Sequence, residues 1–171
     1  MLELNNVLIA VAGLALVLVV WSWLVSQRRQ LRRTLAFVFV GEISAFIREF
    51  EIHAVIEKLE TAVAGKSELG IDFSSFTLPN FIAYEAHATR LSVFGNSMTR
   101  QMTYFYSRLA SLAADFRALS SQDSLIDRDA HSALVGLLLT ESKAELALAD
   151  DILRGLRRFV STSQPSSISR A

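Results

Sequence analysis

Residues 7–25 read VLIAVAGLALVLVVWSWLV, a run of 19 residues without a charged side chain. As an α-helix the run would be about 28 Å long, close to the thickness of the hydrocarbon layer of a bilayer. Trp21 and Trp23 lie near its end, where indole rings favour the boundary between lipid tails and headgroups. A fully buried core helix is the alternative, but a chain of 171 residues could hardly cover it on every side. The run therefore predicts a transmembrane anchor over residues 1–27.

The flanks of the run predict its orientation. Only Glu3 precedes it, whereas four cations follow within the basic collar, residues 28–33: Arg28, Arg29, Arg32 and Arg33. Because arginine is retained on the cytoplasmic side, we expect the N-terminus outside and residues 28–171 inside, and the collar can also contact anionic headgroups. A cleaved signal peptide is the rival interpretation, but the segment before the run, MLELNN, is acidic and no small-residue cleavage pattern follows the run.

Composition excludes several classes of protein. The chain has 17 basic and 17 acidic side chains, and this zero balance argues against a nucleic-acid-binding protein. Without Cys, the chain has no disulfide, thiolate metal site or cysteine nucleophile. The net charge of zero combines three segments of different charge: residues 1–27 carry −1, the collar carries +4 and residues 34–171 carry −3.

Beyond the collar, apolar residues recur at helical spacing, which predicts a helical bundle over residues 34–160. The first helix of the bundle is predicted to end near Gly65 and to carry one core-facing stripe: Phe39, Ile43, Phe46, Phe50, Ile52, Ile56, Leu59 and Val63. A short helix over residues 80–93 follows. Gly95 and Asn96 then suit the end of one helix and the start of the next.

The next helix shows heptad spacing, which is typical of a bundle seam or coiled coil: Met98, Met102, Phe105, Leu109, Leu112, Phe116 and Leu119. The last helix is predicted over residues 124–160, with its stripe at Leu134, Leu137, Leu138, Ala144, Leu148, Ile152, Leu156 and Phe159. The predicted fold is therefore all-α: one N-terminal transmembrane helix that continues into a cytoplasmic antiparallel bundle of three long helices and one short helix.

Two segments are predicted to lie outside regular helices. Residues 65–79, GKSELGIDFSSFTLP, form the main loop, and its Ile71, Phe73 and Phe76 are apolar enough to fold back over the bundle. Residues 161–171, STSQPSSISRA, are rich in Ser and lack periodicity, which predicts a disordered tail.

Polar side chains gather on the predicted short helix and form the main candidate site: Tyr84, Glu85, His87 and Arg90. Such a group beside a bundle can line a small ligand pocket. It can equally form the hydrogen-bonded cap of the end of the bundle, which is the interpretation that we favour.

Glu49, His53 and Glu57 are spaced four residues apart and could share a helix face that binds a divalent metal. However, the chain has neither a Glu-x-x-His nor a His-Glu-x-x-His motif. Glu141 falls where the last helix would need an apolar residue, so it requires a cationic partner or an outward position. Phosphate-binding loops and the serine-hydrolase motif are also missing. We predict no cofactor, no metal and no enzymatic activity.

Residues 81–95, FIAYEAHATRLSVFG, precede the aromatic triplet Tyr104, Phe105 and Tyr106. The pattern resembles one in uncharacterised bacterial inner-membrane proteins with one N-terminal span and a small cytoplasmic helical domain. In that family a Tyr-Glu-Ala-Asn-type segment leads to a Leu-Gly turn and a Phe-Tyr pair, whereas here His87 replaces the Asn and Phe94 replaces the Leu. The resemblance covers residues 78–110 and the anchor layout. It implies an inner-membrane location and no particular activity.

Together these features predict a membrane-anchored helical module that binds a protein partner or a second copy of itself, as an accessory subunit or scaffold. The expected partners are the lipid bilayer and a protein, with no nucleic acid. One alternative is a signal transducer, in which the helix that continues from the span into the bundle relays movement. The other is a bundle that binds a small ligand or metal near His53, or near Glu85 and His87.

Overall fold

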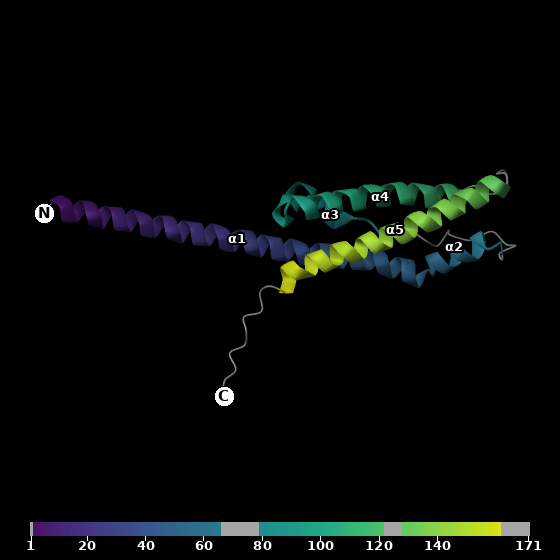
Figure 1. The fold of residues 1–171 in the computed structure, drawn as a ribbon, viewed down its shortest axis with the longest axis horizontal. Helices are drawn as coiled ribbons and strands as arrows, with labels where there is room; N and C mark the ends of the chain where they lie inside the picture. The colour runs from purple at the N-terminus through teal and green to yellow at the C-terminus, as the bar shows by residue number, and fades with distance from the viewer. Residues whose placement is uncertain (1, 66–78, 122–127, 162–171) are drawn as a thin grey trace, which may run out of the picture.

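The chain forms helices alone in the parts that the computed structural model describes, which are residues 2–65, 79–121 and 128–161, with side chains at 13–65, 79–119 and 131–161. In order they are α1 (Leu2–Ile52), α2 (Val55–Val63), α3 (Ile82–His87), the 3₁₀ helix η1 (Ala88–Phe94), α4 (Asn96–Ser121) and α5 (Arg128–Ser161) (Figure 1). No strand occurs in these ranges, which confirms the predicted all-α class.

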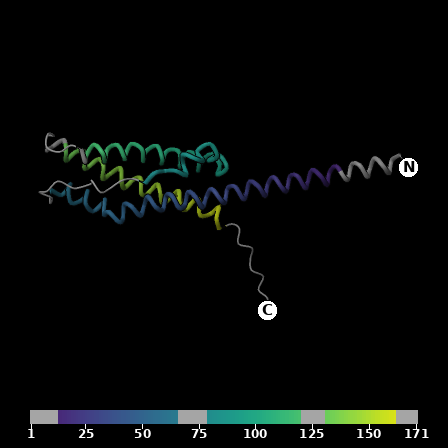
Figure 2. Tube along the Cα trace, turned by 180° about the vertical axis from the view of Figure 1, so that it is seen from behind, coloured from purple at the N-terminus to yellow at the C-terminus, as the bar shows by residue number. Residues whose placement is uncertain are grey.

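α1 is one unbroken helix of 51 residues, and only its second half belongs to the bundle (Figures 1 and 2). Every side chain in residues 13–24 is exposed, and burial begins at Leu35. From there one face is buried: Leu35, Ala36, Phe39, Ile43, Phe46 and Phe50. The last four of these confirm the first four positions of the predicted stripe. Among the residues that the structure describes, no helix combines the length and hydropathy required to cross a membrane.

The prediction of one continuous helix to near Gly65 is wrong, because α1 ends at Ile52 and α2 begins at Val55. Between them Ala54 takes a left-handed backbone conformation with φ of 47°, which an L-residue with a side chain rarely adopts. The turn re-aims the following helix, so that Val55 is buried. Ile52 and Val63, which the stripe placed in the core, are therefore exposed.

α5 runs antiparallel to α1 and α4, whereas α1 and α4 run in the same direction (Figures 1 and 2). Ring contacts follow this parallel register, because Phe39 lies 6.3 Å from Tyr106 and Phe50 lies 6.3 Å from Phe116 between ring centroids. This direction is compatible with the predicted antiparallel order of sequential helices, because the chain returns through α3 between α1 and α4 (Figure 1). When α4 begins, the chain has already returned to the end of the bundle where α1 enters (Figure 1).

The seam predicted for α4 is confirmed, with buried residues at heptad positions: Met102, Phe105, Leu109, Leu112, Phe116 and Leu119. The α5 stripe is correct at Leu138, Ile152 and Leu156, but Leu137 and Ala144 are exposed. The helix keeps one heptad register throughout, and this register places two polar residues inside: Val135, Leu138, Ser142, Glu145, Ala149, Ile152 and Leu156.

The short helix predicted over residues 80–93 is split into α3 and η1. Gly95 ends η1 with φ of 89°, and its N–H donates to the Ser92 carbonyl at 3.1 Å, as expected for a helix-terminating glycine. α4 then starts at Asn96, as predicted. The predicted loop lid with Ile71, Phe73 and Phe76, and the tail beyond Ser161, lie outside the described residues.

The left-handed turn at Ala54 gives a test of the break in the helix. Ala54→Gly should stabilise the fold by about 1 kcal/mol, because glycine relieves the steric conflict of that conformation. Ala110→Gly, at an exposed position within α4, should instead destabilise it by about 1 kcal/mol. Urea unfolding in mild detergent, followed by circular dichroism, measures both. If the two variants lose the same stability, residues 52–55 continue the helix without a turn.

Candidate functional site

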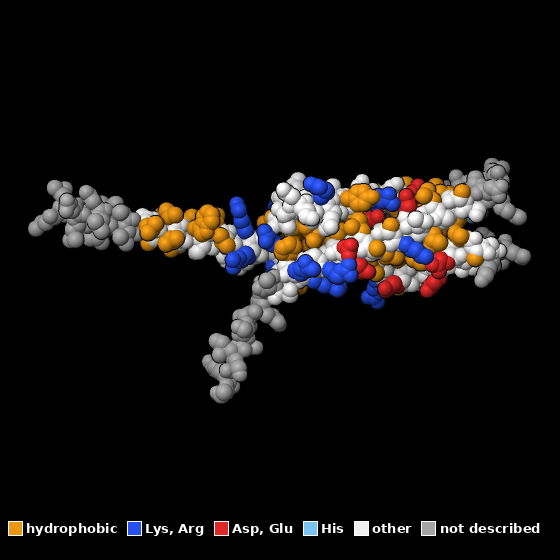
Figure 3. Space-filling model, viewed as in Figure 1, with side chains coloured by type: hydrophobic (Ala, Val, Ile, Leu, Met, Phe, Trp, Pro, Cys, Tyr) orange, Lys and Arg blue, Asp and Glu red, His pale blue; other side chains and the backbone are white. Residues whose placement is uncertain are grey.

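The free part of α1 carries the residues that the sequence assigns to a membrane interface. Trp21 and Trp23 are exposed, with 68% of the Trp21 surface accessible. Ser22, the one clearly polar residue of the apolar run, donates its hydroxyl to the Val19 carbonyl at 3.0 Å, so its polarity is satisfied within the helix. Figure 3 shows hydrophobic side chains around this projecting helix, followed by Lys and Arg where it enters the bundle.

The collar joins the free helix to the bundle. Arg28 and Arg29 are exposed. The Arg32 guanidinium lies 5.3 Å from the centroid of the Phe159 ring, at the end of α5. A cation over an aromatic face is attracted by the ring quadrupole, so the collar also holds the end of α5.

The predicted cluster on the short helix is not a single site. In the described part of the chain no hydrogen bond or ion pair joins the side chains of Glu85, His87 and Arg90, and Glu85 and Arg90 are exposed. Nδ1 of the half-buried His87 is enclosed without a hydrogen-bond partner. Only Tyr84 reaches inward, where its ring stacks on Tyr106 at 4.0 Å between centroids.

Glu42 is the residue that organises this end of the bundle. Its carboxylate accepts hydrogen bonds from the backbone N–H groups of Ala83 at 2.6 Å and Tyr84 at 3.2 Å, in the first turn of α3. These N–H groups have no partner within their own helix, so a side chain of α1 supplies the cap. The sequence pattern did not single out Glu42 as a site residue. Its partners are distant in sequence and could not be found from spacing.

Tyr106 binds the same carboxylate from α4. Its hydroxyl donates to Oε2 of Glu42 at 2.7 Å. Burial raises the pKa of Tyr106 far above its usual range, and the hydrogen bond to Glu42 and the nearby negative charge act in the same direction. Tyr106 is therefore a permanently neutral donor. Glu42, Tyr84 and Tyr106, which we call the Glu42 hub, connect α1, α3 and α4. The side chain that caps α3 is Glu42, which the predicted cluster did not include.

A second polar group lies between α4 and α5. Nη2 of Arg108 lies 3.4 Å from Oε1 of Glu141, and Nε of Arg108 lies 3.7 Å from Oε2 of Glu145. The buried heptad position belongs to Glu145, which is 3% exposed, and not to Glu141 as the sequence suggested. Burial raises the pKa of Glu145 to about 7 despite the opposing effect of Arg108. Oε1 of Glu145 and the hydroxyl of Ser142 are enclosed without hydrogen-bond partners.

The predicted metal face is divided by the break after α1. Nε2 of His53 lies 3.4 Å from Oε2 of Glu49 within one helical turn. Glu57, however, belongs to α2, which follows the left-handed turn. Among the described residues no three His, Asp or Glu side chains are grouped closely enough to hold a metal ion.

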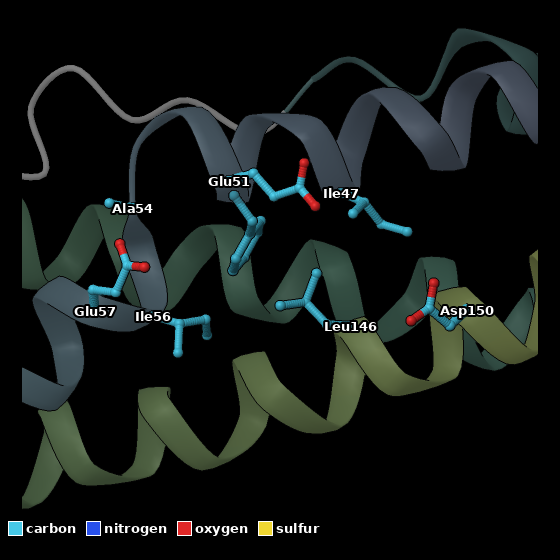
Figure 4. A pocket seen from close by; sticks show the side chains of 8 residues that line it. Ile47, Glu51, Ala54, Ile56, Glu57, Leu146 and Asp150 are labelled. Atoms are coloured by element: carbon cyan, nitrogen blue, oxygen red, sulfur yellow. The ribbon is translucent and has the colours of Figure 1, made fainter.

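The break also opens a surface groove of about 340 Å³ between α1, α2 and α5 (Figure 4). Its apolar lining comprises Ile47, Phe50, Ala54, Ile56 and Leu146, and its rim carries three carboxylates, Glu51, Glu57 and Asp150. All three acids are exposed, and no cation pairs with them among the described residues. The groove, which the sequence did not predict, combines an apolar floor with a negative rim. We call it the acidic groove.

The Glu42 hub can be tested with a matched pair of tyrosines. Tyr106→Phe removes the hydroxyl that donates to Glu42 and should destabilise the bundle by about 1–2 kcal/mol, since the half-buried Glu42 carboxyl group loses a hydrogen-bond donor. Tyr104→Phe removes an exposed hydroxyl and should change stability by less than about 0.5 kcal/mol. Thermal and urea unfolding of the full chain measure the difference. Equal effects would mean that the hydroxyl of Tyr106 does not hold the hub together.

Glu145 should make stability depend on pH. Because its pKa rises from about 4.5 to about 7 on folding, the native state keeps a proton that the unfolded state has released between these values. Stability should therefore fall as the pH rises from about 4.5 to about 7 and then level off. Glu145→Gln should remove this decline and be more stable than the parent above pH 7, whereas Glu85→Gln should keep the parental profile. The urea concentration at the midpoint of unfolding, measured across this pH range, tests the prediction. If Glu145→Gln shows the same pH dependence as the parent, Glu145 is not the group responsible.

Comparisons with protein-family models, with curated proteins and with solved structures found no match to this chain. The resemblance of residues 78–110 to bacterial inner-membrane proteins stays a prediction.

Proposed function

We propose that the protein is a single-pass membrane protein whose helical bundle binds a partner protein on the cytoplasmic side, as an accessory subunit or scaffold without catalytic activity. The observation that carries the proposal is the projecting part of α1. All side chains from residue 13 to 24 are exposed, and nine large apolar side chains lie among them: Leu14, Leu16, Val17, Leu18, Val19, Val20, Trp21, Trp23 and Leu24.

An apolar surface of this kind is unfavourable in water, because each square ångström of exposed apolar area forfeits about 25 cal/mol of burial free energy. Lipid tails supply cover for a helix that is apolar on every side, since all its backbone groups are already hydrogen-bonded. The exposed collar, with Arg28 and Arg29, then lies at the cytoplasmic headgroups. In this arrangement the bundle lies on the cytoplasmic side of an inner membrane, and the residues that precede the apolar run lie on the opposite side.

The acidic groove is the surface that best supports a protein partner. An apolar floor rimmed by Glu51, Glu57 and Asp150 is complementary to a segment in which Lys or Arg flanks an apolar side chain. Such a partner buries its apolar residue on Ile56 and Leu146, while its cations meet carboxylates that have no cationic partner within the described chain.

The unbroken helix from the apolar run to Phe50 favours relay of movement as a second function. Glu42 lies on this helix and holds both α3 and Tyr106 of α4. A rotation of α1 in the membrane would therefore displace the cap of α3. In this second function the protein is a signal transducer, and the bundle is the part that changes conformation in response to movement of α1.

Site-specific crosslinking tests the partner surface. A photoreactive residue at Ala54 in the full chain, in native membranes, should capture a protein through a peptide that contains Lys or Arg beside an apolar residue. The pair Glu51→Lys and Glu57→Lys should lower the yield severalfold, because it reverses the charge of the rim. Glu85→Lys, at an exposed position on α3, is the matched control and should leave the crosslinking yield unchanged.

Three results would contradict the proposal. They are equal yields in the groove and control variants, capture of an acidic peptide, and crosslinks only to a second copy or to another segment of the same chain.

A further inference from the structure

The end of α5 lies beside the collar, although more than a hundred residues separate them in sequence (Figure 1). Phe159 fixes this arrangement, because its ring lies under the Arg32 guanidinium at 5.3 Å and 5.5 Å from the Phe94 ring. Near this contact, α5 approaches α4 closely, since Gly155 leaves space for the methyl group of Met98. The last turns of α5 are thus held at the end of the bundle where α1 enters.

These last turns carry three exposed arginines, Arg154, Arg157 and Arg158. Together with the collar they place seven arginines at one end of the bundle. Of the three, Arg154 pairs with Asp151 in the same helix. Figure 3 shows Lys and Arg gathered near the entry of α1, whereas Asp and Glu lie farther along the bundle. Although the net charge of the chain is zero, its positive and negative side chains are therefore unevenly distributed along the bundle.

We propose that the collar and the end of α5 form one binding surface for anionic phospholipid headgroups. The inference rests on the proposed membrane anchor and extends it, because the anchor alone needs only the collar. Arginine at the negative end of a helix dipole also stabilises that helix, but this role does not depend on lipid composition. Phosphate diester groups accept the forked hydrogen bonds of guanidinium. With both sets of arginines engaged, the end of α5 lies against the membrane surface.

The absence of Cys allows a direct test on the full chain, because Ser161→Cys provides a single labelling site just after the three arginines. The labelled protein is reconstituted into vesicles of phosphatidylcholine alone or mixed with phosphatidylglycerol. Each vesicle contains a lipid with a quencher on its headgroup. Quenching of a fluorophore at residue 161 should be severalfold stronger with phosphatidylglycerol, and high salt should weaken it.

Charge variants identify the surface. Arg154→Gln, Arg157→Gln and Arg158→Gln together should reduce quenching in phosphatidylglycerol to the level in phosphatidylcholine, whereas the same three sites changed to Lys should retain most of it. The matched control removes three cations elsewhere on the bundle, Arg48→Gln, Lys58→Gln and Arg117→Gln, and should quench like the parent. Far-ultraviolet circular dichroism checks that each variant remains folded.

Alkaline extraction of the same vesicles separates the two proposals. A chain that stays inserted but is quenched equally in both lipid mixtures overturns the α5 surface and leaves the anchor intact. A chain that is released by alkali overturns both. Quenching that follows total charge, so that the control variant loses as much as the α5 variant, also overturns the specific surface.

Discussion

The bundle is built on the second half of α1, which presents one buried face from Leu35 to Phe50 to the other helices. Its aromatic rings reach α4 directly, since Phe46 lies 5.6 Å from Phe105 in an edge-to-face contact. The same helix continues without a break into the exposed apolar segment. Any position taken by that segment therefore fixes the position of the core face. This rigid connection is why a membrane anchor, if inserted as proposed, also orients the bundle.

Within an apolar bundle, two polar groups specify how the helices meet. In the Glu42 hub, a side chain of α1 caps α3 and also binds Tyr106 of α4. The hub therefore fixes the position of α3 relative to α1 and α4. Arg108 pairs α4 with Glu141 and Glu145 of α5. Buried polar contacts of this kind add little net stability but penalise alternative alignments, because a shifted helix would leave them without partners. Oε1 of Glu145 remains without a hydrogen-bond partner, and burial raises the pKa of this side chain.

Local patterns predicted much of the fold, since the α4 heptad, the stripe from Phe39 to Phe50 and the turn at Gly95 all depend on residues close in sequence. Three features could not be found this way. The break at Ala54 occurs without Gly or Pro, so propensity gave no signal for it. The buried heptad positions of α5 include Ser142 and Glu145, and polar residues are not recognised as core positions from a pattern of apolar residues. The hub joins residues 42, 84 and 106, and only the tertiary arrangement brings them together.

The central claim is that the exposed apolar part of α1 lies in lipid with the bundle on the cytoplasmic side. Two single-cysteine variants of the cysteine-free chain test it, Leu16→Cys in the projecting helix and Ser107→Cys on the exposed surface of α4. A membrane-impermeant maleimide is applied to intact cells and to opened membranes. The account predicts that Ser107→Cys reacts only after opening and that Leu16→Cys reacts in neither sample, because a thiol in lipid forms little thiolate. Reaction of Leu16→Cys as fast as Ser107→Cys, or of Ser107→Cys in intact cells, would contradict it.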